Sequence, residues 1–121
     1  MLPSACERTF TTEVLEADVP VVVSFWAPWC GLCRLVDPIL TQVKLDSDLP
    51  IKLVRVNADE NLRLSNRYRL TNLPTLLLFH QGHLIKRLDH FNTRDDLRYS
   101  LEQLVTEIPQ CELNRGIPAL L

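Results

Sequence analysis

The stretch Val21-Val-Val-Ser-Phe-Trp-Ala-Pro-Trp-Cys-Gly-Leu-Cys-Arg34 decides the fold, because an apolar run ends directly at two cysteines that lie three positions apart. The nearly continuous β-branched and aromatic run over residues 19–26 predicts a strand that is covered on both faces. After Cys33, apolar residues recur at the spacing of one helix face, at Val36, Ile39, Leu40 and Val43. We therefore expect the two thiols where a strand ends and a helix begins.

The rest of the chain continues this alternation of strands and helices. The spacing of apolar residues predicts strands over 51–56, 75–79 and 84–91 and a short helix near 62–68. Gln81-Gly82 is typical of a hairpin turn between the last two strands. A last helix is predicted from Thr93, which has capping-box spacing to Asp96. Two prolines and a glycine break the pattern after residue 106. We expect one domain over residues 1–106 and a tail over 107–121.

The composition is that of an ordinary folded domain. Of its 121 residues 46% are hydrophobic and 23% are charged, and the formal net charge is -2. This charge creates no field that would attract nucleic acid or an anionic membrane. The first residues do not read as a secretory signal, although a mature form whose targeting segment had been removed would look the same. No apolar run is long enough to cross a bilayer. We expect a cytoplasmic protein without nucleic-acid or membrane partners, whose four cysteines serve catalysis or metal binding.

The chemistry is predicted to lie in the pair Cys30 and Cys33. A thiol at a helix start is stabilised as the thiolate by unpaired N–H groups, which makes Cys30 the candidate nucleophile. Cys33, one turn further on, can attack the mixed disulfide that Cys30 forms and release the reduced substrate. Two alternatives remain open. The pair could supply half of a zinc site with His80 and His83, or could pack as two small buried hydrophobes.

The chain resembles thioredoxins in residues 21–34, in Leu73-Pro-Thr-Leu-Leu-Leu-Phe79 and in its β-α-β-α-β-β-α order, over about residues 9–106. The resemblance implies an α/β thioredoxin fold, with a central mixed four- to five-stranded sheet flanked by helices on both faces. It also implies a protein disulfide oxidoreductase without a cofactor. Its partners would be disulfide-containing proteins and an electron-donating reductase such as a thioredoxin reductase. We expect a monomer that works in the reducing direction.

The resemblance further assigns roles around the cysteines. It implies a cis peptide at Leu73-Pro74 beside the active site, where the backbone near Leu73 pairs with an extended substrate segment. An ordinary trans turn proline is the alternative. Trp29 would be an exposed apolar contact next to the thiols. Trp26 would pack beneath the site, or would simply belong to the core.

Two positions depart from the thioredoxin pattern beneath the site. Ser24 stands where thioredoxins usually carry a buried aspartate that assists proton transfer at the resolving cysteine. A serine hydroxyl does not titrate near neutral pH, so we expect slow deprotonation of Cys33 and weak turnover. Arg55 replaces the lysine that usually pairs with this aspartate. With the pair broken, Arg55 is expected to be a supporting residue of the site or a solvated or packing residue.

Two further departures lie beside the thiols. Gly31 is retained between the cysteines, but Leu32 replaces the usual proline and restores a backbone N–H near Cys30, which predicts a somewhat more oxidising pair. His90 occupies a loop position that is usually glycine. It could accept a proton or select substrates, or could be an ordinary exposed loop residue.

Features outside the matched motif leave other hypotheses open. Cys6 and Cys111 are either inert extra thiols or a redox switch. The amino-terminal segment is short for the usual first strand, which we expect to be reduced or absent. The altered groove and the missing aspartate favour a rival function, a docking or regulatory module with little turnover. A second rival is disulfide oxidation or isomerisation.

Overall fold

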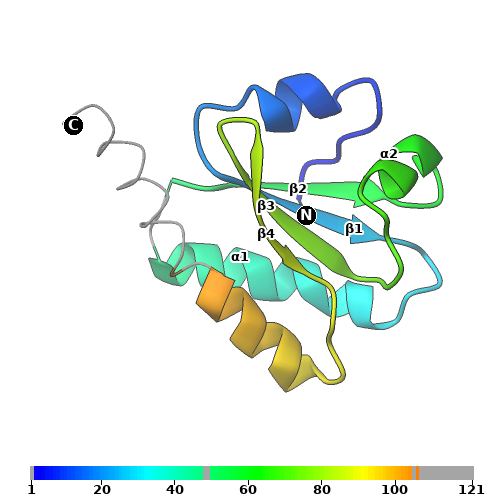
Figure 1. Cartoon of the computed structure of the whole chain (residues 1–121). Coiled ribbons are helices and arrows are strands. Elements are labelled where there is room, and N and C mark those ends of the chain that lie inside the picture. Colours follow the sequence, from blue (N-terminus) through cyan, green and yellow to red (C-terminus); the bar gives the residue numbers. More distant parts are fainter. Residues whose placement is uncertain (1, 48–49, 105, 107–121) are drawn as a thin grey trace.

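The computed structural model describes residues 2–47, 50–104 and 106 (Figure 1). Its described strands form a single mixed sheet in the order β2-β1-β3-β4. Their bounds are Val21–Trp26 for β1, Lys52–Asn57 for β2, Thr75–His80 for β3 and His83–Leu88 for β4. β1 pairs in parallel with β2 and antiparallel with β3, which in turn pairs antiparallel with β4. The predicted α/β fold with a mixed sheet is confirmed.

Helices cover both faces of the sheet (Figure 1). The first face packs against α1, Val36–Ser47, and against a carboxyl-terminal helix that includes residues 94–104. The second face packs against α2, Leu62–Arg67, and against η1, a π-helical turn over Thr11–Leu15. Each face of the sheet carries its own hydrophobic core. Alternating residues of β1 contribute side chains to the two cores, Val22 to the core on the first face and Val23 to the core on the second. β1 and β3 are consequently buried almost throughout.

The amino-terminal segment agrees with the sequence-based expectation in its strand but not in its helical turn. Its strand is reduced to one parallel bridge between Ser4 and Arg55, as expected. The π-helical turn η1 was not predicted, since its residues carry no clear helical period. Phe10 and Val14 nevertheless anchor this segment, because both side chains are almost fully buried in the second core.

Local signals account for the remaining turns and ends. Gln81 and Gly82 both have positive φ, 52° and 81°, as a two-residue hairpin turn of the primed type requires. The N–H of Asp96 donates to Oγ1 of Thr93 at 3.1 Å, which confirms the predicted cap of the last helix. β4 ends at Leu88 rather than at residue 91, so the segment that includes His90 is a loop. The predicted tail over 107–121 lies outside the described residues.

Candidate active site

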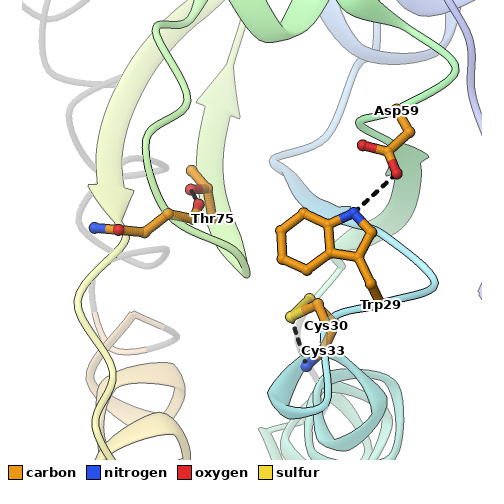
Figure 2. Close-up of a disulfide and its surroundings, with 6 residues drawn as sticks. Trp29, Cys30, Cys33, Asp59 and Thr75 are labelled. Carbon is orange, nitrogen blue, oxygen red and sulfur yellow. Dashed lines mark hydrogen bonds between the residues drawn. A yellow bond between two sulfur atoms is a disulfide. The ribbon is translucent and has the colours of Figure 1, made fainter.

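Cys30 and Cys33 are joined in a disulfide at the carboxyl end of β1 (Figure 2). Their Cα atoms lie 5.4 Å apart, and both residues are mostly buried, at 6% and 7% exposed. The strand, a short loop and the start of the following helix place the pair where the sequence predicts it. A sulfur pair at this position can be opened by an external thiolate and formed again by oxidation.

The helix begins inside the motif. Gly31 caps η2, a 3₁₀ turn over Leu32–Leu35, and α1 follows directly at Val36. The N–H of Cys33 donates to Sγ of Cys30 at 3.2 Å, so the donor to this sulfur in the structure is the amide of Cys33. Such a donor favours the thiolate form of Cys30 once the disulfide opens.

The two residues between the cysteines differ in their structural constraints. Gly31 has an ordinary helical φ of -64°, and a Cβ atom built there would meet nothing within 4 Å. The backbone and the space around it therefore do not require glycine at this position. Leu32 is half-buried and packs against the first core.

Trp29 provides the exposed apolar surface next to the thiols. It is 70% exposed, and its indole Nε1–H donates to Oδ2 of Asp59 at 2.9 Å (Figure 2). Sequence reasoning missed Asp59. Its position two residues after β2, a strand parallel to β1, was the available signal, because the carboxyl ends of parallel strands share one edge of the sheet.

The peptide bond between Leu73 and Pro74 is cis, as predicted. Pro74 is buried and Leu73 is half-buried, packing against the second core. The Thr75 hydroxyl donates to the carbonyl oxygen of Asn72 at 2.6 Å and closes the turn that carries the cis bond.

A groove of about 390 Å³ lies beside Trp29, and we call it the active-site groove. One wall consists of Thr71, Asn72 and Leu73, and the other consists of Asp89, His90, Phe91 and Asn92. The side chain of His90 is 85% exposed, and its Nε2 lies 3.2 Å from Oδ1 of Asp89. His90 is thus both an exposed loop residue and part of the groove.

A small cavity of about 90 Å³ lies beneath the disulfide, lined by both cysteines, Trp26 and Arg55 among others. The Arg55 guanidinium stacks 4.1 Å from the centre of the Trp26 ring. Its Nη1 lies 3.2 Å from Oδ2 of Asp37, at the start of α1. Arg55 is therefore no solvated residue, because it keeps a carboxylate partner that comes from the helix instead of from β1.

Ser24 is 1% exposed and stands in register with Arg55 on the neighbouring parallel strand. Residues in register point to the same face of the sheet, so both side chains belong to the face that carries α1. At position 24 this face offers a hydroxyl group, which has no useful titration near neutral pH.

Cys6 is a free thiol with a perturbed environment. The pKa of this thiol is lowered, first by the hydroxyl of Thr9, whose Oγ1 lies 3.7 Å from Sγ, and then by backbone hydrogen bonds. Cys6 lies in a separate pocket with Trp26, Asn57 and Asn61. Cys111 lies outside the described residues.

Neither a membrane-spanning helix nor a metal-binding cluster is found among the described residues. No helix in residues 2–47, 50–104 and 106 is long and apolar enough to cross a bilayer. Within the same residues, no three His, Cys, Asp or Glu side chains gather in a way that could hold a metal ion.

Comparison with known proteins agrees with this geometry. The thioredoxin family model matches residues 3–103. Thioredoxin 1 of Nostoc sp. is 39% identical over 97 residues, which cover 80% of this chain and 91% of that protein. Thioredoxin 1 of Synechococcus elongatus is 43% identical over 76 residues, 63% of this chain and 71% of that protein. Thioredoxin M4, chloroplastic, of Arabidopsis thaliana is 36% identical over 106 residues, 88% of this chain and 55% of that longer protein.

Proposed function

The chain belongs to the thioredoxin family and is a protein disulfide oxidoreductase, and from this premise we propose that it reduces disulfides of other proteins through Cys30 and Cys33. The observation that carries the proposal is the disulfide at a helix start, beside the exposed Trp29 and the cis peptide at Pro74. This arrangement offers a nucleophile, a resolving thiol and a docking surface within one short region.

The reaction would proceed in two exchange steps. In the reduced protein, the Cys30 thiolate attacks one sulfur of the substrate disulfide. A bond forms between Cys30 and the substrate, and the other substrate sulfur leaves as a thiolate that takes up a proton. The Cys33 thiolate then attacks Sγ of Cys30, and the second substrate sulfur leaves. Two electrons and two protons pass to the substrate, and the Cys30–Cys33 disulfide forms.

The same proposal gives each residue of the site a role. The N–H of Cys33 supports the Cys30 thiolate, and Trp29 contacts the incoming protein. The backbone near Leu73 pairs with an extended substrate segment along the active-site groove. Beneath the disulfide, the side chains of Trp26 and Arg55 support the site, and Ser24 supplies no proton acceptor.

The surrounding biology is part of the same proposal. A reductase that supplies a dithiol would return the Cys30–Cys33 disulfide to the reduced form. We place the protein in the cytoplasm as a monomer, with residues 1–106 as the working domain and 107–121 as a tail. The small net charge of -2 favours protein substrates over nucleic acid or membrane partners.

Trapping tests this function directly. In a Cys33→Ser variant the first exchange step can occur but the second cannot, so mixed disulfides between Cys30 and its substrates should accumulate. A Cys30→Ser variant is the matched control and should trap far less. Whether the protein reduces or oxidises its substrates is tested by measuring the reduction potential of the Cys30–Cys33 pair. For a reductase this potential should lie below the cytosolic glutathione poise of about -220 to -260 mV. A much higher potential would instead indicate an oxidase or isomerase.

The buried Ser24 favours a second candidate, a thioredoxin-fold module that docks partners with little turnover. The docking module predicts that proteins bind the groove without covalent trapping by the Cys33→Ser variant. Recovery of partners that withstand denaturant, are released by reducing agents and are lost with Cys30 would exclude it.

A further inference from the structure

The two walls of the active-site groove come from separate parts of the chain. The first wall follows α2 and leads into the cis peptide, and the second follows β4. A protein segment lying in the groove would meet both walls at once. The spacing between the walls therefore determines which segments fit, and a contact that joins them would control this spacing.

Arg87 makes such a contact. It lies on β4, two residues before Asp89, and its Nε donates to Oδ2 of Asp89 at 2.8 Å. Its Nη2 donates to the carbonyl oxygen of Arg69 at 2.8 Å, and its Nη1 donates to the carbonyl oxygen of Tyr68. One guanidinium group thus bonds to the second wall and to the segment that enters the first wall.

The acceptors explain why an arginine is needed here. Tyr68 is the carboxyl-terminal cap of α2, and carbonyl groups at a helix end lack partners within the helix. Arg69 turns the chain out of the helix with a positive φ of 50°. The planar guanidinium carries donors in a fixed fork, which can bind adjacent carbonyls and a carboxylate together, whereas a lysine ammonium is a single point donor.

The contact also reaches the exposed rim of the groove. Oδ2 of Asp89 accepts from Arg87, and Oδ1 lies beside Nε2 of His90. The Asp89 side chain is only 17% exposed, so its position is restricted by its surroundings and by both neighbours. Arg87 thereby fixes the orientation of the wall that presents His90.

We propose that Arg87 is a positioning residue that sets the spacing of the groove walls and so controls the binding of protein substrates. This inference rests on the proposed reductase function and names a determinant of its substrate selection. Arg87 does not belong to the groove lining or to the cavity beneath the disulfide. Its loss should weaken the binding of proteins that span the groove and leave the reactivity of Cys30 toward small disulfides unchanged.

The test compares Arg87→Lys with Arg98→Lys, a control on the last helix. The control also removes an arginine whose Nε bonds to a carboxylate, that of Glu102 at 3.1 Å, but Arg98 does not line the groove. Two rates are measured with each reduced protein: turnover of insulin disulfides and reaction with the small disulfide dithiobis-nitrobenzoate. Arg87→Lys should raise KM for insulin about tenfold, a loss of about 1.4 kcal/mol, with kcat and the small-disulfide rate within about twofold of the wild type.

Equal losses of both rates, or no change in KM, would overturn the proposal. If Arg87→Lys does not fold, Asp89→Asn serves as the second variant, because it keeps the carbonyl contacts of Arg87 and weakens its bond to the second wall, together with the contact between Asp89 and His90. Since Asp89 lines the groove, this variant is read by hydrogen exchange alone. Hydrogen exchange gives a readout that does not depend on turnover. Amides of 69–73 and 89–92 should exchange faster together in Arg87→Lys and not in Arg98→Lys. If the wild type itself fails to reduce insulin, the proposed function fails, and hydrogen exchange still decides the role of Arg87.

Discussion

Ser24→Asp tests whether the missing carboxylate limits the reaction. Position 24 is 1% exposed, so an aspartate there loses its hydration, which disfavours the ionised form. Arg55 stands in register on the neighbouring strand and offers a cation on the same face, which favours the ionised form. With this partner in reach, we expect a loss of about 1–3 kcal/mol in the free energy of unfolding, below the penalty for an unpaired buried charge.

The same substitution should accelerate the second exchange step. A positioned general base contributes roughly 10²–10⁴-fold. Because Arg55 weakens the basicity of the new carboxylate, we expect an acceleration at or below the lower limit of this range, about tenfold to a hundredfold at neutral pH. The assay starts from the mixed disulfide of Cys30 with thionitrobenzoate and follows the release of the coloured thiolate by stopped flow. The wild-type rate should rise with pH, because without a general base the second step depends on the fraction of Cys33 that is already a thiolate.

Ser24→Asn is the matched control, since asparagine has the shape of aspartate but cannot accept a proton in this pH range. The reasoning is refuted if the Asp and Asn variants release thionitrobenzoate at the same rate over the whole pH range. A faster Asp variant that loses its advantage in an Arg55→Met background would instead reveal that the arginine orients the new base.

Three further predictions concern the thiols and the core. Leu32→Pro should lower the reduction potential by about 30 mV, measured by alkylation trapping in glutathione buffers, because it removes one of the N–H groups whose dipoles at the helix start favour the reduced pair. Thr9→Val should raise the pKa of Cys6, because it deletes the hydroxyl that does most to lower this pKa. Iodoacetamide alkylation of Cys6, with Cys30, Cys33 and Cys111 replaced by serine, should therefore slow at neutral pH and level off only at higher pH. Leu77→Ala, at a fully buried position, should cost about 2–5 kcal/mol and shift the urea midpoint with an unchanged slope.

Much of the fold is predictable because its central elements have strong periodic signals. The apolar run before Cys30 and the run after Pro74 became the two buried inner strands. Helix spacing after Cys33 and the Thr93 cap predicted the helices of the first face. The π-helical turn η1 was missed, because two buried anchors four residues apart do not distinguish it from a loop.

The candidate site was predictable where residues are adjacent in sequence and not where distant residues meet. The position of the cysteine pair follows from a local motif, and the exposed Trp29 and the cis peptide are what the resemblance carried by such motifs implies. The partners Asp59, Asp37 and Arg87 do not, because each contact depends on strand register or on the approach of two loops. A charged residue near a predicted strand end has many possible partners, and only the folded structure selects one.

The short bridge at Ser4 has a consequence for association between copies of the chain. The N–H of Ala5 donates to the carbonyl oxygen of Arg55 at 2.9 Å, and the N–H of Arg55 donates to the carbonyl oxygen of Pro3 at 2.9 Å. These two bonds occupy the backbone groups of Arg55 in the middle of the outer edge of β2, which would otherwise be open to a foreign strand. A chain shortened past Ala5 would expose this edge, and would be more prone to aggregate even if its disulfide chemistry survived.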